Sequence, residues 1–314
     1  MRVLLTKAKR ILCIAGLFYL SPKRRLAVER RLRGRDDCRL LGRSDAAIVS
    51  FGKSGRTWLR VMLSRYFQVS FDLPRHMLIG YDNMHRRDAR VPKLFFTHDN
   101  YLKDYTGHCD SKQDYFDHKV VLLVRHPADI AVSQYYQWRY RMTPHKKRLN
   151  GYPAHGADVS LIDFVMGEQA GLPKIIGFLN LWADAASRMR DLLIVRYEDM
   201  RAAPARELAR VVGFLGMPAS DEAIRDAVAF AAFENMKGLE HKGLFRFAGR
   251  RMRPGDRANP DSYKVRRAKV GGYRDYFSDE QVRAIDGLIE RTLSERFGYQ
   301  SCTTPAQPPA VLTA

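Results

Sequence analysis

One loop combines small residues with a lysine and hydroxyl groups, a composition typical of phosphate-binding turns: Ser50-Phe51-Gly52-Lys53-Ser54-Gly55-Arg56-Thr57-Trp58. The apolar run 46–49 before it predicts a buried strand, and apolar residues after it recur at helical spacing. Such a turn directs backbone N–H groups at one point, where the helix N-terminus adds partial positive charge. Lys53 adds a full charge and Thr57 a hydroxyl. The loop predicts a phosphate site, with a turn that binds no ligand as the alternative.

The order of residues in this loop differs from the Walker A motif of nucleoside triphosphatases. Walker A places its lysine directly after the second glycine and follows it with Ser or Thr. Here Lys53 precedes Gly55. A lysine at the start of the loop reaches the bridging oxygen of a shorter ligand, so we expect a different phosphate compound.

A second group of polar residues follows another apolar run. Residues 119–124 predict a central strand of a parallel sheet, and Pro127 suits the first position of a helix continuing from 130 to 140. Arg125 therefore lies at the carboxyl end of a strand, where open α/β sheets bind ligands. Ser133 lies about two helical turns further on and could face the same crevice. Together they could hold a phosphate; a surface arginine and a neutral helix serine are the alternative.

Taken together, these runs resemble the sulfotransferases that use 3′-phosphoadenosine-5′-phosphosulfate (PAPS), most closely the cytosolic branch. Residues 53–58 resemble the 5′-phosphosulfate loop of that family, and residues 125–133 its 3′-phosphate motif. Residues 192–200 resemble its strand and Tyr-Glu-Asp turn, and residues 266–273 its late basic loop. We expect a bacterial member. The resemblance implies an α/β fold: a central, mostly parallel sheet with helices on both faces, related to P-loop nucleotide kinases.

The resemblance also implies a reaction and its catalytic residues. An acceptor hydroxyl, or less favourably an amine, attacks sulfur in line and adenosine 3′,5′-bisphosphate (PAP) leaves. His98, at the end of the strand-like run 92–98, matches the catalytic histidine of the family. Imidazole suits a general base because its ordinary pKa is near neutral. Lys53 would stabilise charge on the departing phosphate oxygen. The transferred group carries little charge compared with a γ-phosphate, so no metal is expected.

The implied PAPS contacts fall into three groups. The 5′-phosphate would be held by the backbone amides of Ser54, Gly55, Arg56, Thr57 and Trp58 and by the Thr57 side chain, with Lys53 at the departing phosphate oxygen. The 3′-phosphate would be held by Arg125, Ser133 and Arg266, with Arg267 and Ala268 in the same late loop. The adenine would stack between Trp58 and Phe233, with Tyr197 at its edge.

The chain departs from the family pattern at four places. Phe96 replaces the lysine two residues before the catalytic histidine, so one auxiliary cation is missing. Asp99-Asn100 replaces the usual Leu-Pro, which predicts a different acceptor side. Arg56 replaces a frequent threonine and could contact phosphate or point to solvent. Ala268 stands where glycine is usual, which weakens the assignment of Arg267 as a phosphate ligand.

Length and composition predict one domain with extensions. The 314 residues divide into a basic and apolar N-terminal arm (1–44), a sulfotransferase domain (45–299) and a disordered tail (300–314). Four cysteines without C-x-x-C spacing favour a reducing, cytoplasmic compartment and no cysteine zinc site. Residues 141–160 lack periodicity and predict a long acceptor-side loop. Residues 278–281 predict a capping box that opens the last helix.

The net charge of +20 is larger than one PAPS requires. Residues 1–43 hold 13 Lys or Arg against 3 Asp or Glu, a balance of +10. They also contain the apolar run 11–20, which is shorter than the roughly 20 residues of a membrane-spanning helix. Two interpretations stay open: a peripheral helix on the anionic inner face of the cytoplasmic membrane, or an arm that packs on the domain. Membrane contact would favour a glycan, lipid-linked or otherwise amphiphilic acceptor over a small phenol.

A second basic segment, 237–274, is either a solvated surface or an electrostatic funnel for an anionic donor. Two other functions remain as alternatives. The first is a nucleotide-dependent phosphotransferase, which an α/β core could also support. The second is a non-catalytic protein that binds nucleic acid or membrane through its charge, although no specific nucleic-acid partner is expected. The sequence does not indicate an oligomeric state.

Overall fold

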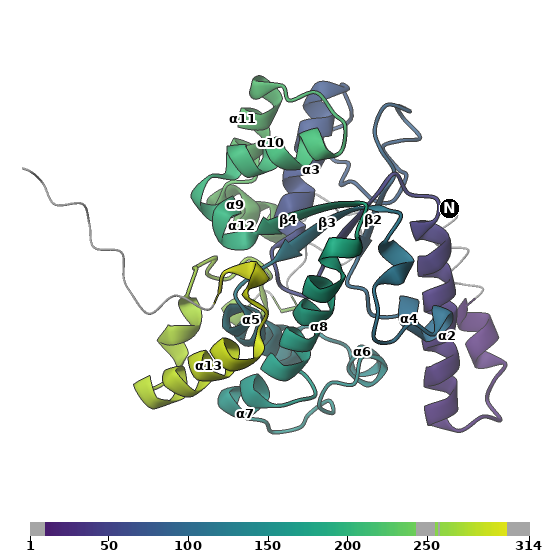
Figure 1. Cartoon of the computed structure of the whole chain (residues 1–314), viewed down its shortest axis with the longest axis vertical. Coiled ribbons are helices and arrows are strands. Elements are labelled where there is room, and N and C mark those ends of the chain that lie inside the picture. Colours follow the sequence, from purple (N-terminus) through teal and green to yellow (C-terminus); the bar gives the residue numbers. More distant parts are fainter. Residues whose placement is uncertain (1–9, 243–254, 257, 300–314) are drawn as a thin grey trace, which may run out of the picture.

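The computed structural model of the chain describes residues 10–242, 255–256 and 258–299 (Figure 1). The predicted disordered tail, 300–314, lies outside the described residues, as do the first nine residues of the arm and part of the second basic segment.

The described strands form one parallel four-stranded sheet in the order β2-β1-β3-β4. Its strands are β1 (Ala46–Ser50), β2 (Leu94–Thr97), β3 (Lys119–Val124) and β4 (Asp191–Arg196). In the register, Ile48 pairs with Phe96 on one side and with Val121 on the other. Because all four strands run the same way, their carboxyl ends lie along one edge. The prediction of a central, parallel sheet is confirmed.

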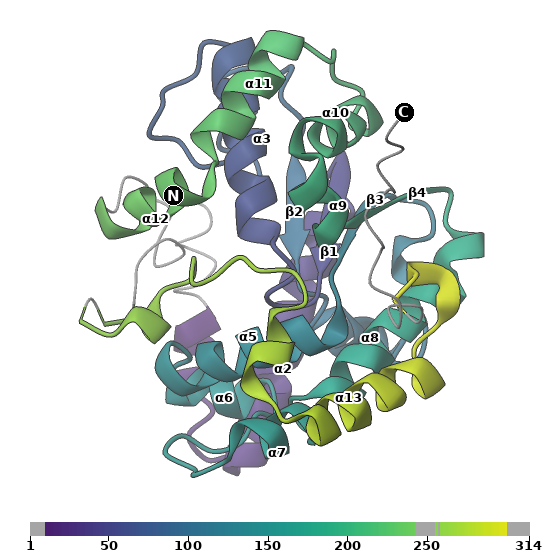
Figure 2. The ribbon, with the colours of Figure 1, turned by 90° about the vertical axis from the view of Figure 1, so that its left-hand side faces the viewer.

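Helices cover both faces of the sheet, as predicted (Figures 1 and 2). One face packs against α3 (Arg56–Ser70), α9 (Tyr197–Ala202), α10 (Pro204–Phe214), α11 (Asp221–Phe230) and α12 (Phe233–Lys242). The other packs against α2 (Pro22–Leu41), α4 (Leu102–Thr106), α5 (Pro127–Tyr140), α7 (Leu161–Met166), α8 (Leu172–Ala185) and α13 (Asp279–Thr292). The short helix α6 (Pro144–Leu149) lies between α5 and α7 in sequence.

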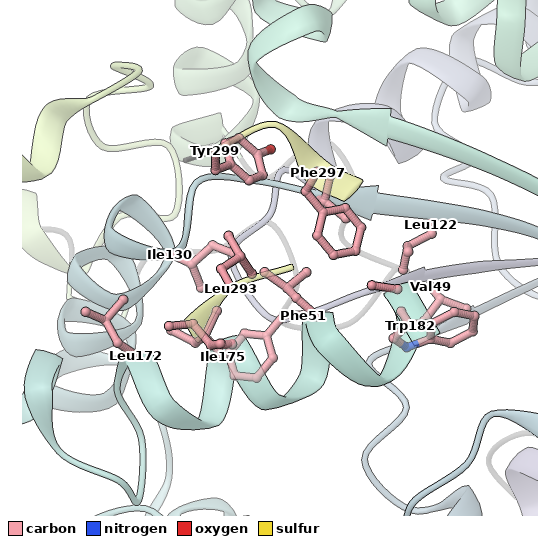
Figure 3. Close-up of a cluster of buried hydrophobic side chains, with 14 of the residues drawn as sticks. Val49, Phe51, Leu122, Ile130, Leu172, Ile175, Trp182, Leu293, Phe297 and Tyr299 are labelled. Carbon is pink, nitrogen blue, oxygen red and sulfur yellow. The ribbon is translucent and has the colours of Figure 1, made fainter. Parts of the chain in front are cut away.

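Side-chain alternation along the strands separates two hydrophobic cores. Ile48 and Val121 point into the core beneath α3, whereas Val49 and Leu122 point into the core beneath α5 and α8. Figure 3 shows the second core, where α8 residues such as Trp182 face the sheet. Burial on both faces explains why β1 and β3 read as continuous apolar runs.

The connections place a crevice between β1 and β3. The chain leaves β1 into α3 on one face and leaves β3 into α5 on the other. Neighbouring parallel strands whose following helices diverge leave a crevice between their carboxyl ends, where open α/β sheets bind ligands. The loop after β1 and Arg125 after β3 are the segments that border it.

Of two elements predicted from local sequence, the capping box of the last helix is confirmed and the long loop over residues 141–160 is wrong. Ser278 and Gln281 form the predicted capping box at α13. Residues 141–160 are not a continuous loop, because α6 occupies Pro144–Leu149. Thr143 accepts a hydrogen bond from the Lys146 N–H and Pro144 takes a first-turn position, so two local helix-start signals outweigh the missing periodicity.

Helix α2, within the predicted N-terminal arm, packs against α4 (Figure 1). Arg30 donates to both carboxylate oxygens of Asp104, at 2.9 and 2.8 Å, and to the Leu149 carbonyl. Gly34 is required at the contact, because a Cβ there would lie 2.2 Å from the Tyr101 carbonyl oxygen. Of the described helices, none has the length and apolarity to cross a bilayer.

Candidate functional site

A cavity of about 1800 Å³ extends along the carboxyl edge of the sheet. All but one of the residues predicted for the site line it: Lys53, Gly55, Arg56, Thr57, Trp58, His98, Arg125, Ser133, Tyr197, Phe233, Arg266, Arg267 and Ala268. The exception, Ser54, is buried within the loop. The fold thus gathers residues that are more than 200 positions apart in sequence.

The loop after β1 has the tight geometry of an anion-binding turn. Gly55 is the N-cap of α3 in the left-handed conformation, with φ of 90°, and a Cβ there would lie 2.5 Å from the Tyr197 ring. Lys53 also has a positive φ, 74°, a conformation that L residues seldom adopt. The buried Ser54 Oγ has no hydrogen-bond partner among the described residues. The loop therefore offers a helix N-terminus and an unused hydroxyl.

Lys53 is surrounded by other positively charged side chains. Burial and, to a smaller extent, the nearby cations Arg141, Arg266 and Arg125 together lower its pKa to about 7. Burial also lowers the pKa of Lys264 well below its ordinary value, with Lys53 the largest charge contribution. Cations crowded so closely repel one another, so a bound polyanion would relieve an existing electrostatic cost.

Arg125 joins the loop to the other side of the crevice. Its Nη1 donates to the Lys53 carbonyl at 3.3 Å, and its Nη2 donates to Asp129 Oδ2 at 3.2 Å and to the Lys269 carbonyl at 3.1 Å. Its guanidinium lies 4.4 Å from the centre of the Tyr197 ring. The buried Nε has no partner among the described residues. Arg125 is thus fixed in place with one donor unused.

The late basic loop is held over the cavity by Asp129. Its two carboxylate oxygens accept hydrogen bonds from the backbone N–H groups of Gly271 and Tyr273, each at 3.0 Å. Ala268 has φ of 50°, a left-handed conformation that glycine adopts at less cost than alanine. Arg266 packs over the Tyr136 ring at 3.6 Å, whereas Arg267 is half exposed and paired with Asp275. Arg266 is the better placed of the two for a ligand.

His98 follows β2 directly and has a defined tautomer. Its Nδ1 lies 2.9 Å from the Ser50 carbonyl, which can only accept, so Nδ1 carries the proton. Nε2 is then unprotonated and accepts a hydrogen bond from Arg56 Nη2 at 2.7 Å. Burial lowers the pKa of His98 well below its ordinary value, and the Arg56 charge lowers it further. The imidazole is therefore neutral near pH 7, the form that a general base requires.

The residues predicted to surround adenine lie close together. Trp58 Nε1 donates to the Ala231 carbonyl at 2.8 Å, which fixes the indole next to the start of α12 and Phe233. Tyr197 meets the Trp58 ring edge to face, with ring centres 6.0 Å apart. Their contacts with a base stay a prediction.

Three residues around the site were not anticipated from the sequence. Arg141 and Lys264 line the cavity, and the buried Glu240 organises both. Its carboxylate pairs with Arg141 at 3.2 Å and accepts the backbone N–H groups of Lys264 and Val265. Lys264 lies two residues before Arg266 and could have been included with the basic loop. Arg141 follows α5 without a motif, and only the fold brings it to Lys53.

These features fit a ligand with two phosphate groups. Lys53 of the loop after β1 lines the cavity together with Arg125, Ser133 and Arg266. Charge-assisted hydrogen bonds from such groups are the strong contacts of anion recognition. Among the described residues, no group of three or more His, Cys, Asp or Glu side chains is arranged to hold a metal ion.

A family model described as a sulfotransferase domain matches residues 112–297, more than half of the chain. Cytosolic sulfotransferase 17 of Arabidopsis thaliana is 28% identical over 269 residues, which cover 79% of this chain and 73% of that protein.

Two solved structures share the fold. Mouse sulfotransferase SULT7A1 in complex with PAP has a TM-score of 0.52 and 20% identity, and the match covers 81% of this chain and 89% of that chain. Retinol dehydratase in complex with retinol and PAP has a TM-score of 0.53 and 18% identity, with 88% of each chain covered.

Proposed function

Because the chain belongs to the sulfotransferase domain family and is a PAPS-dependent sulfotransferase, we propose that His98 and Lys53 carry out sulfuryl transfer to an acceptor hydroxyl. One observation carries this proposal: Lys53, His98 and Arg125, from the ends of three different strands, line one cavity. This arrangement puts a cation, a neutral base and a second anion-binding group within reach of one substrate.

The proposed mechanism follows from the protonation states of these residues. His98 Nε2, held toward the cavity by the Nδ1 hydrogen bond to Ser50, accepts the proton of the acceptor hydroxyl. The acceptor oxygen forms a bond to sulfur, and the bond between sulfur and the 5′-phosphate oxygen breaks. The leaving oxygen keeps the electron pair, and Lys53 stabilises its charge. The absence of a required metal stays a prediction.

Arg125 would hold the 3′-phosphate, using the donor that has no partner among the described residues. We expect Arg125→Ala to weaken PAP binding at least about tenfold, because a hydrogen bond to a charged group contributes roughly 1.5–3 kcal/mol. Turnover at saturating PAPS should change less than the affinity. Calorimetric titration of the variant with PAP measures this effect.

Arg190→Ala is the matched control, since Arg190 is exposed and pairs with its neighbour Asp191 outside the cavity. It should bind PAP like the wild type. Unchanged PAP affinity in Arg125→Ala would contradict the 3′-phosphate assignment.

Features of the N-terminal arm support a proposal that the acceptor side of the cavity faces a membrane. The apolar run of the arm exposes Ile11, Leu12, Phe18 and Tyr19, each at least 65% accessible. The cationic residues Lys23, Arg24 and Arg25 follow at once. Arg10 and Cys13 of the same arm line the cavity that contains His98.

We propose that the tip of the arm, the apolar run 11–20, docks on an anionic bilayer while α2 stays packed on the domain. The acceptor is then amphiphilic, glycan-bearing or lipid-linked. The protein would then be cytoplasmic and peripheral to the membrane.

Replacing two exposed apolar residues of the tip tests the docking. The double variant Leu12→Ser/Phe18→Ser should lose at least about tenfold in partitioning onto vesicles that contain phosphatidylglycerol, because burying one such side chain contributes roughly 1.5–3 kcal/mol. Sedimentation with vesicles, at low and high salt, measures it. Val270→Ser, which alters an exposed apolar side chain outside the arm, is the control. Equal partitioning of the double variant and the wild type would rule out the tip as the docking site.

The proposed acceptor class is tested by label transfer. Purified protein is incubated with sulfur-labelled PAPS and separate fractions of host lipids, glycans and small phenols. Transfer to hydroxyl-bearing lipids or glycans supports the proposal, and transfer to phenols alone contradicts the acceptor class. Label from γ-labelled ATP with Mg²⁺ in place of PAPS would indicate a phosphotransferase.

A further inference from the structure

Arg56 contacts the predicted catalytic histidine instead of pointing to solvent. It is the first residue of α3, directly after the phosphate loop, and its guanidinium reaches the end of β2. Nη1 donates to the Thr97 carbonyl, and Nη2 lies 2.7 Å from His98 Nε2. The N–H group that contacts Nε2 thus lies where the hydroxyl of an acceptor has to arrive.

Position 96, two residues before His98, provides no positive charge beside the histidine. Phe96 replaces the lysine of the family pattern, and its ring packs with the core beneath α3. The Arg60 guanidinium, one helical turn after Arg56, covers that ring at 3.7 Å and donates to the Ile79 carbonyl. Two arginines of α3 therefore lie over the end of β2: Arg60 against the Phe96 ring and Arg56 against His98 Nε2.

We propose that Arg56 is a catalytic residue that stabilises the transferring sulfuryl group, in place of the cation missing at position 96, and that it caps His98 Nε2 while the acceptor site is empty. This inference rests on the proposed sulfuryl transfer. A guanidinium has five N–H donors, so one can stay on the Thr97 carbonyl while another turns from Nε2 to a sulfuryl oxygen. The acceptor proton then moves to the vacated Nε2, as the new oxygen–sulfur bond forms and PAP leaves with its electron pair.

Three variants separate this role from phosphate binding. Arg56→Gln should lower kcat about ten- to a hundredfold with PAP affinity nearly unchanged. Arg56→Lys should keep more activity than Arg56→Gln, because it retains a charge. Adding Phe96→Lys to Arg56→Gln returns a cation to position 96 and should recover part of the loss. Arg190→Gln, outside the cavity, is the control for the loss of one arginine charge.

The pH profile provides a readout that a structural role would not change. The Arg56 charge lowers the pKa of His98, so its removal should raise that pKa and move the acid limb of kcat/KM to higher pH. Wild-type kcat in Arg56→Gln, with or without weakened PAP binding, would overturn the inference. If the double variant with Phe96→Lys does not fold, the comparison of kcat between Arg56→Lys and Arg56→Gln still tests whether the charge at position 56 matters. A wild-type protein without PAPS turnover would instead reject the proposed function.

Discussion

His98→Ala lowers turnover by at least about a hundredfold, because general-base catalysis typically contributes 10²–10⁴. His98→Asn should lose as much, even though its amide can still donate to the Ser50 carbonyl. Both variants should bind PAP like the wild type, since His98 contacts the Ser50 carbonyl and the Arg56 guanidinium rather than the backbone amides proposed to hold the 5′-phosphate. Steady-state kinetics with PAPS, together with PAP calorimetry, measure the two effects separately.

His108 is the matched control for this result. It pairs with Asp114 at 2.8 Å, is more than a third exposed and lies outside the cavity. His108→Ala should keep wild-type turnover. Wild-type kcat in His98→Ala would remove the base assignment, whereas loss of PAP binding would indicate a collapsed site.

Lys53→Ala should lower kcat by about 10²–10³, the typical effect of removing one preorganised group that stabilises transition-state charge. It should also change the pH dependence of PAP binding. The free protein has a Lys53 pKa of about 7, and bound phosphates favour the charged form and raise that pKa. Above pH 7, wild-type binding therefore takes up as much as one proton, and affinity falls as pH rises. Calorimetry in two buffers of different ionisation enthalpy measures the uptake.

Lys174 provides the control for proton uptake. Burial lowers its pKa to about 8. Lys174 does not line the cavity itself, and it donates to the carbonyl of Asn150, which does. Lys174→Gln should leave the uptake at the wild-type value, whereas Lys53→Ala should abolish most of it. Equal uptake in the wild type and Lys53→Ala would contradict the position of Lys53 beside the phosphates.

The parts of the fold that follow from local sequence were predicted well. Buried strands carry continuous apolar runs, as at 119–124, and helix starts carry residues such as Pro127 and Ser278. The motifs then identify residues at the carboxyl ends of strands, which a parallel sheet brings to one edge. This reasoning is sufficient to place Lys53, His98 and Arg125 in one cavity.

Features that depend on long-range packing could not be predicted. Glu240 looks like any helix carboxylate until α12 buries it against Arg141 and the Lys264 backbone. Arg56 looks like a first-turn helix residue, because nothing in its neighbourhood shows that its side chain crosses to β2. The packing of α2 on α4 depends on Gly34, whose importance appears only once Tyr101 lies against it.

The central claim is that one cavity binds both phosphates of an adenosine bisphosphate. Calorimetric titration of the purified protein with PAP, and separately with adenosine 5′-monophosphate, tests it most directly. PAP should bind at least about tenfold more tightly, because the proposed contacts of Arg125, Ser133 and Arg266 would be made only with the 3′-phosphate. Equal affinity for the two nucleotides, or neither heat nor thermal stabilisation on addition of PAP, would contradict the account.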